Sequence, residues 1–333
     1  MRVSIKIEKA KEYRLKYGMD MPTLKLARLM YNNNNLLFKD IEDARKKLRY
    51  IEGKVGTKNR QEINDERFIL KEERAKNPYN LPESDANEFI PYTIKGHSRG
   101  VIFGDLHFPY QSNEAITAAF TSAKKFNPDF VFLNGDVLDF YGVSYFCKDP
   151  RKRTFAAELK IFKDFFIVLQ KTFKCKIYFK FGNHEERYDK FLFQKAGELV
   201  GVEEFELENI IKARAEGIEV IKDKRMVVMN GLPFIHGHEF GRGVFSPVNA
   251  ARGLFLQAKH SCVKGDCHTT SHHVEPNIFS KIMTTYSHGC LCDLHPEFLP
   301  FNKWNNGYME IELDSNGKEY EIDNKSIYNG KVY

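Results

Sequence analysis

Two short apolar runs, each ended by a glycine and an acid, place the strongest constraint on the fold of this chain. Residues 101–107 read Val-Ile-Phe-Gly-Asp-Leu-His, and residues 131–139 read Val-Phe-Leu-Asn-Gly-Asp-Val-Leu-Asp. Short runs of branched and aromatic residues are typical of buried parallel strands. In open α/β sheets, ligands bind beyond the carboxyl ends of such strands. We therefore expect the polar residues that follow the two runs to meet in one crevice: Asp105, His107, Asp136 and Asp139.

Further segments place metal-binding side chains directly after apolar runs. Residues 177–187 end in Gly-Asn-His-Glu-Glu-Arg, residues 232–238 in His-Gly-His, and residues 261–268 in Gly-Asp-Cys-His. A lone histidine is usually structural, but five strand-end loops of one design are not explained by core packing. Crowded carboxylates repel one another unless cations neutralise them, so the pattern predicts a metal site. The added candidates are Asn183, His184, His236, His238, Asp266, His268, His272 and His273.

The order and spacing of these motifs resemble those of the calcineurin-like metallophosphoesterases, over about residues 99–313. The resemblance is carried by Gly-Asp-Leu-His, Gly-Asp-Val-Leu-Asp, Gly-Asn-His-Glu, His-Gly-His and Gly-Asp-Cys-His. Gly-Asn-His-Glu-Glu-Arg and Asp-Phe-Tyr-Gly look most like the bacterial and phage-type members. Phe140 and Tyr141 stand where the protein Ser/Thr phosphatases carry arginine and glycine, which argues against that branch.

The resemblance implies a centre of two divalent metal ions. One ion would be held by Asp105, His107 and His268. The other would be held by Asn183 and His236, with Asp136 bridging the pair. Such pairs clamp a phosphoryl group and lower the pKa of a bound water. Mixed oxygen and nitrogen ligands suit Mn²⁺, the favoured ion, and also Fe or Zn²⁺.

The resemblance also implies the catalytic and substrate-binding residues. His184 would stabilise or protonate the leaving group, and Asp139 would orient its imidazole. Arg187, Arg242 and His238 are the candidates for contact with the substrate, because they lie in or just after the third and fourth motifs.

One position departs from the family pattern. The last motif is normally Gly-His-x-His, whereas Asp266 stands here in place of the first histidine. We expect Asp266 to ligate the second ion through oxygen. In the alternatives, the second ion is weak or absent, or His238, His272 or His273 substitutes. Otherwise His272 and His273 are expected at the rim of the site.

Charge separates the chain into two parts. Residues 1–100 hold 22 Lys and Arg against 15 Asp and Glu, whereas the remainder holds 29 against 30. The pattern predicts a basic helical region at 1–75, a linker at 76–98 and a phosphoesterase domain at 99–333. Two helices around Asn32–Asn35 would form a helix-turn-helix-like module that binds nucleic acid. The alternative is a helical arm that packs on the main domain or on another subunit.

Alternating strands and helices after residue 99 predict an α/β fold. With the resemblance, this becomes a four-layer αββα sandwich of two mixed sheets behind the basic helical region. Strands are expected at 100–104, 129–134 and 175–181, and helices at 113–126, 154–173 and around 186–213. A second, more antiparallel sheet would hold strands near 218–221, 226–229, 233–236, 261–264, 281–286 and 308–313.

The sequence also bears on location and activity. It contains no apolar run of about 18 residues and no signal-peptide pattern, and its six cysteines lack paired spacing, so we expect a cytoplasmic protein with free thiols. We expect a phosphoesterase that hydrolyses a phosphodiester, with nucleic acid as the candidate substrate. One alternative is a phosphomonoesterase for a small metabolite or a phosphoprotein. The other is a catalytically weak protein that binds nucleic acid or serves in assembly.

Overall fold

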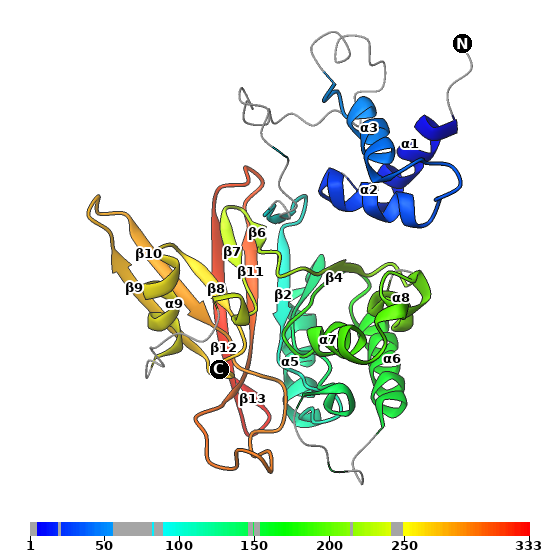
Figure 1. The fold of residues 1–333 in the computed structure, drawn as a ribbon. Coiled ribbons are helices and arrows are strands. Elements are labelled where there is room, and N and C mark those ends of the chain that lie inside the picture. Colours follow the sequence, from blue (N-terminus) through cyan, green and yellow to red (C-terminus); the bar gives the residue numbers. More distant parts are fainter. Residues whose placement is uncertain are drawn as a thin grey trace. The chain divides into compact units, whose positions relative to one another are not determined.

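The structure, a computed structural model, describes residues 5–18, 21–55, 82, 89–145, 149, 154–213, 216–240 and 249–333. The chain divides into two compact units, Met1–Ile90 and Pro91–Tyr333 (Figure 1). Among the helices of the described residues, none combines the length and the apolar composition that crossing a membrane needs.

The N-terminal unit contains three helices, α1 (Ile5–Tyr17), α2 (Thr23–Asn32) and α3 (Ile41–Ile51). Helix α3 begins where the side chain of Asp40 accepts a hydrogen bond from the backbone N–H of Asp43 at 2.7 Å. The expected pair of helices around a turn is therefore part of a three-helix unit. Its shared core consists of Ala10, Tyr13, Leu26, Ala27, Met30, Phe38, Ala44, Leu48 and Ile51.

A buried ion pair joins the three helices. Arg14 of α1 donates from Nε to Oε1 of Glu52, at the end of α3, at 2.9 Å. The hydroxyl of Thr23, at the start of α2, donates to Oε2 of Glu52 at 2.8 Å. Removing one partner of such a pair leaves a buried charge unpaired, which typically costs about 3–5 kcal/mol.

The larger sheet of the second unit has the strand order β13-β12-β11-β2-β3-β4-β5. Its four parallel strands are β2 (Arg99–Phe103), β3 (Phe130–Asn134), β4 (Lys176–Lys180) and β5 (Glu219–Ile221). Its antiparallel strands are β11 (Asn306–Leu313), β12 (Tyr320–Tyr328) and β13 (Lys331–Val332).

The smaller sheet has the strand order β1-β6-β7-β8-β10-β9 and mixes parallel with antiparallel pairs. Its strands are β1 (Tyr92–Ile94), β6 (Val227–Met229), β7 (Leu232–Phe234), β8 (Cys262–Lys264), β9 (Ser271–Pro276) and β10 (Ile282–Ser287).

Residues 76–81 and 83–88 of the expected linker lie outside the described residues, and residues 92–94 form β1, which pairs in parallel with β6. One expectation about the strands was wrong. The strands expected near 218–221 and 308–313 lie in the larger sheet instead of the second one. There β5 pairs with β4, and β11 pairs with β2, with Met309 opposite Ile102.

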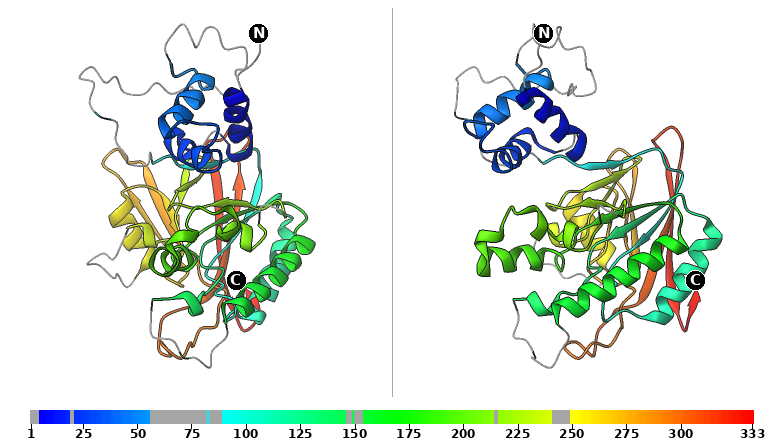
Figure 2. Two further views of the ribbon diagram at one scale, coloured as in Figure 1. Left: turned by 45° about the vertical axis from the view of Figure 1, so that its right-hand side comes forward. Right: turned by 90° about the vertical axis from the view of Figure 1, so that its right-hand side faces the viewer.

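Helices cover the outer faces of both sheets, which gives four layers (Figures 1 and 2). Strand β2 shows the reason, because Val101 and Phe103 pack toward the helices while Ile102 packs between the sheets. Helix α9 (Ala250–Ala258) covers the smaller sheet through Leu254. The larger sheet is covered by α5 (Asn113–Phe126), α6 (Phe155–Thr172), α7 (Glu186–Lys195) and α8 (Leu207–Ile210).

Short 3₁₀ turns connect several of these elements. They are η2 (Tyr141–Val143), η3 (Gly197–Leu199), η4 (Glu203–Phe205) and η5 (His238–Phe240).

Candidate metal centre

The predicted ligands follow five strands at their carboxyl ends, three in the larger sheet and two in the smaller one. The site therefore lies at the edge where the ends of both sheets meet. The residues are Asp105 and His107 after β2, Asp136 after β3, Asn183 after β4, His236 after β7, and Asp266 and His268 after β8.

The backbone at five of these positions is left-handed, although none of the five is a glycine. The φ angles are 51° at Asp105, 50° at His107, 50° at Asp136, 62° at Asp266 and 53° at His268. Such conformations cost of order 1 kcal/mol or more each and cluster at functional sites. Here they turn each side chain from the end of its strand into the shared crevice.

The first group of side chains is formed by Asp105, His107 and His268. Nε2 of His107 lies 3.1 Å from Nε2 of His268, so a proton or a cation must lie between the two nitrogens. Nε2 of His268 is 3.4 Å from Oδ1 of Asp105. That buried oxygen accepts no hydrogen bond from any described residue, which is costly unless an ion binds it. This group therefore fits a divalent cation.

The second group is formed by Asp136, Asn183, His236 and Asp266. Nε2 of His236 lies 3.2 Å from Oδ2 of Asp136, 3.1 Å from Oδ1 of Asn183 and 3.8 Å from Oδ1 of Asp266. One carboxylate oxygen of Asp136, one of Asp266 and a nitrogen of His236 lie within 4.8 Å of one another. Asp266 thus contributes a carboxylate oxygen to this second group.

Asp136 belongs to both groups. Its Oδ2 lies 3.9 Å from Nε2 of His107 on one side and 3.2 Å from Nε2 of His236 on the other. The backbone approaches this carboxylate closely at Gly182, where an added Cβ would lie 2.2 Å from Oδ1 of Asp136. Only glycine fits there.

Neighbouring oxygens fix the orientation of two ligand imidazoles. Nδ1 of His236 donates to the backbone carbonyl of Asn134 at 2.7 Å, so Nε2 is the ring nitrogen directed at the crevice. Nδ1 of His107 faces Oδ1 of Asp139 at 3.4 Å in the same way.

His184, Asp139 and Arg187 form a cluster at the side of the crevice. Nδ1 of His184 donates to the backbone carbonyl of Asp139 at 2.9 Å and lies 3.2 Å from Oδ1 of the same residue. Arg187 donates to that carbonyl at 2.7 Å and to Nε2 of His184 at 2.8 Å. Nε2 of His184 is also 3.7 Å from Oδ2 of Asp136, so it faces the shared carboxylate.

The electrostatics of the crevice depend on its carboxylates and imidazoles together. Burial alone would raise the pKa of Asp105, but His268 and the other imidazoles lower that pKa to about 2. Burial opposes the charged form of His236, yet Asp136 and other carboxylates hold its pKa well above the ordinary value. Burial raises the pKa of Asp266, and Asp136 and Asp105 add to the rise against the opposing effect of His236. These negative groups favour a bound cation.

The pKa of His184 follows the same balance. Burial lowers it, but the carboxylates of Asp136 and Asp139 outweigh burial and raise the pKa. The hydrogen bond from Arg187 requires Nε2 to be unprotonated, so the two observations oppose each other. The geometry decides for the resting arrangement, in which Nε2 accepts from Arg187.

Two glutamates hold the ligand loops, the buried Glu185 and the half-buried Glu239, and neither was predicted to do so. Glu185 accepts hydrogen bonds from the backbone N–H groups of Asp136, Val137 and Leu138 at 2.9–3.0 Å. Glu185 could have been identified from the sequence, because it belongs to the Gly-Asn-His-Glu motif. Glu239 accepts from the backbone N–H of His236 at 3.0 Å and pairs with Lys180 at 2.8 Å. Its spacing carried no recognisable signal.

His288 and Trp304 also contact the ligands and were not predicted to do so. Nδ1 of His288 is 3.7 Å from Oδ2 of Asp105. His288 directly follows β10, so the design of the other strand ends was a usable signal. The centroid of the Trp304 ring lies 4.1 Å from that of the His268 ring.

Several candidates lie apart from the ligand groups. Nε2 of His238 lies 3.0 Å from Oε1 of Glu186, on α7, so this nitrogen is engaged outside the two ligand groups. His272 and His273 are on the edge strand β9, where His273 pairs with Glu275 at 3.0 Å. Arg242 lies outside the described residues.

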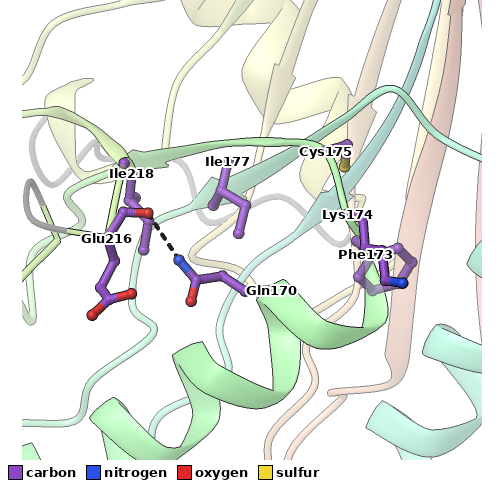
Figure 3. Close-up of a pocket in the computed structure, with 8 residues that line it drawn as sticks. Gln170, Phe173, Lys174, Cys175, Ile177, Glu216 and Ile218 are labelled. Carbon is purple, nitrogen blue, oxygen red and sulfur yellow. Dashed lines mark hydrogen bonds between the residues drawn. The ribbon is translucent and has the colours of Figure 1, made fainter.

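A separate pocket lies at the opposite end of β4 from the metal centre. It has a volume of about 80 Å³, and Gln170 donates to the backbone carbonyl of Glu216 across it at 2.9 Å (Figure 3). It contains none of the predicted site residues.

Comparison with known proteins places this geometry in a family. The model of the family described as calcineurin-like phosphoesterase matches residues 99–298. No curated protein matches the chain significantly. A single mutant of Vps29 from Entamoeba histolytica is 12% identical, with a TM-score of 0.38, and the similarity covers 71% of this chain and 96% of that one. The phosphoesterase Yfce from E. coli is 13% identical, with a TM-score of 0.32, and the similarity covers 68% of this chain and 98% of that one.

Structural similarity at these TM-scores does not extend to substrate or partners. The family match is different, because it spans more than half of the chain and includes all seven predicted ligands. The chain belongs to the calcineurin-like phosphoesterase family and is a metal-dependent phosphoesterase.

Proposed function

We propose that this protein is a phosphodiesterase with two divalent metal ions, favouring Mn²⁺, and that nucleic acid is its substrate. The observation that carries the two-metal part is the position of Asp136. Its carboxylate is shared by a group with Asp105 and His107 and a group with His236 and Asp266. A carboxylate between two such groups suits the short separation of the ions in binuclear phosphoesterases, roughly 3.5–4 Å.

The ligands divide between the two ions as follows. Asp105, His107 and His268 would hold one ion, and Asn183, His236 and Asp266 would hold the other. The bound ions would supply Lewis acidity to the phosphoryl group. Asp266 makes the second position richer in oxygen than the usual family pattern, which favours a harder ion such as Mn²⁺.

His184 is the proposed proton donor to the leaving oxygen. Asp136 and Asp139 raise the pKa of its imidazole, which favours the protonated form needed for donation. Arg187 donates to Nε2 of His184 at 2.8 Å. A substrate oxygen that draws Arg187 away would free Nε2 to take up a proton from solvent, which His184 would then donate to the leaving oxygen. Arg187 would then contact the phosphate through its planar guanidinium.

The charge of the N-terminal unit supports nucleic acid as the substrate. Arg28 on α2 and Lys46 on α3 are exposed, in the part of the chain that carries the excess of Lys and Arg. Exposed basic side chains on a helical unit favour contact with phosphate backbones. For DNA binding, the slope of log K against log salt concentration should become smaller by about one when Lys46 is replaced with Ala. Replacing Lys160, on α6, with Ala should leave this slope unchanged. Equal salt slopes would contradict a contact at Lys46.

The proposed location of the protein is a reducing cytoplasm. All five cysteines among the described residues are free thiols, which supports this location. We also propose that the chain resembles the bacterial and phage-type members of the family, because of its motifs at 182–187 and 139–142.

Hydrolysis of two model esters by the Mn²⁺-loaded protein tests the proposed activity. Bis-p-nitrophenyl phosphate is a diester and p-nitrophenyl phosphate is a monoester with the same leaving group. We expect a higher kcat/KM for the diester. A preference for the monoester would replace the proposal with a phosphomonoesterase, and absence of turnover on both would contradict an active centre.

A further inference from the structure

A loop between β10 and β11 exposes aromatic side chains next to the metal centre. It covers residues 293–304 and is the orange segment at the lower edge of Figure 1. Phe298 is 78% exposed and Phe301 is 93% exposed. Large apolar side chains gathered at a surface usually mark a binding site. Together with Trp304 they are called the aromatic ledge here.

The loop has a defined frame. The side-chain amide of Asn302 donates to the backbone carbonyls of Leu294 at 2.6 Å and Leu299 at 2.9 Å. Its Oδ1 accepts from the backbone N–H of Trp304 at 2.9 Å. These bonds hold the backbone that carries the aromatic residues in a defined conformation.

The aromatic ledge begins at a metal ligand. The centroid of the Trp304 ring lies 4.1 Å from that of the His268 ring, and Phe298 packs edge-on to Trp304 with 6.3 Å between ring centroids. Because His268 belongs to the first ligand group, an ester group on a phosphorus bound at the centre can extend directly across these rings.

We propose that the aromatic ledge stacks the nucleobase of an unpaired nucleotide whose phosphate lies at the metal centre. The inference rests on the proposed phosphodiesterase function and narrows its substrate to single-stranded nucleic acid or a small nucleotide diester. Every base has a flat apolar face, and stacking on aromatic side chains needs no particular sequence.

The charge of the loop favours a base over a membrane surface. Residues 293–304 contain one lysine, Lys303, and two acids, Asp293 and Glu297. Anionic lipid surfaces attract clusters of Lys and Arg, which this loop lacks. A nucleobase is uncharged, and its phosphate charge is met by the metal centre.

The chain contains a single tryptophan, Trp304, so its fluorescence reports on the aromatic ledge alone. Titration of the Mn²⁺-loaded protein with thymidine 5′-monophosphate and with deoxyribose 5-phosphate compares two ligands that differ only in the base. We expect the nucleotide to bind about five- to a hundredfold more tightly and to change Trp304 fluorescence.

Variants assign that difference to the loop. In Phe298→Ala/Phe301→Ala the preference for the nucleotide should shrink, because only Trp304 of the aromatic ledge remains, while the affinity for deoxyribose 5-phosphate is retained; an unchanged preference would contradict stacking on the loop. Phe298→Tyr should keep the preference for the nucleotide. Phe279→Ala is the matched control, because Phe279 is 87% exposed in the turn between β9 and β10, beyond the amino end of β10.

Three further results would overturn the proposal. They are equal affinities in the unaltered protein, vesicle binding that the double variant loses, and self-association that it loses. Binding to vesicles of phosphatidylglycerol and phosphatidylcholine measures the membrane outcome. Sedimentation at several protein concentrations measures self-association. Phosphate release recorded in parallel detects monoester hydrolysis, which would contradict the diesterase assignment, and the affinities are compared at times before phosphate is released.

Discussion

Nε2 of His236 lies 3.2 Å from Oδ2 of Asp136, although the two residues follow strands of different sheets. Asp136 follows β3 of the larger sheet, and His236 follows β7 of the smaller one. The candidate centre is therefore built across the seam of the sandwich. Any change that shifts one sheet against the other will separate its ligands, so the packing of Phe132 against Phe234 between the sheets supports the site.

Replacement of His184 should affect turnover and leave the metal ions in place. His184→Gln removes the proposed proton donor, and general acid catalysis contributes typically 10²- to 10⁴-fold. We expect a fall in kcat of about this size, with unchanged metal content by elemental analysis.

His273→Gln is the matched control, because His273 pairs with Glu275 on the edge strand β9 and belongs to neither ligand group. Its kcat should stay within about threefold of the unaltered value. Full activity of His184→Gln would remove His184 from the role of proton donor.

Asp266 can be tested by its effect on one ion of the pair. In Asp266→Ala, the proposed second ion would lose an oxygen ligand, so its binding should weaken. The ion held by Asp105 and His268 should keep its affinity. Titration with Mn²⁺ by calorimetry would resolve the two steps, and Asp266→His should restore the second one. Identical titrations for all three proteins would show that Asp266 is not a ligand.

Glu158 should make stability depend on pH near neutrality. This residue of α6 is buried, and burial together with Asp139 raises its pKa to about 7. Its Oε2 accepts no hydrogen bond from the described residues, as suits a protonated carboxyl. Because the folded pKa lies above the unfolded value, the stabilisation is full below about pH 4 and is lost as the pH rises through about 7.

Glu158→Gln does not ionise and should therefore avoid this loss. Relative to the unaltered protein, its free energy of unfolding should rise between pH 5 and pH 8 by on the order of 2 kcal/mol. Urea unfolding at both pH values measures the difference. A pH-independent difference would contradict a raised pKa at Glu158.

The ligand positions were predictable because parallel strands bring their carboxyl ends to one edge. Asp105, Asp136 and Asn183 each follow such a strand, so alternation of strands and helices was enough to place them together. His288 follows β10 in the same way, so its place at the site could also have been predicted. The position of Trp304 could not, because its contact with His268 depends on the path of a long loop.

Sheet membership was harder to predict than strand location. The residues of β11 alternate apolar with acidic side chains at 309–313, as a strand does, but nothing local specifies that Met309 lies opposite Ile102. Strand β1 is short and follows Pro91, so its sequence resembles a linker until β6 is placed beside it. Long-range pairing, which a local pattern does not contain, decided both cases.

The stoichiometry of Mn²⁺ in the unaltered protein and in Asp136→Asn tests the central claim most directly. Asp136 is the residue shared by both ligand groups, so elemental analysis after equilibrium dialysis should find two ions per chain, and fewer than one in the variant. Asp189→Asn, on α7, should retain two. One ion in the unaltered protein, or two in Asp136→Asn, would contradict a binuclear centre bridged by Asp136.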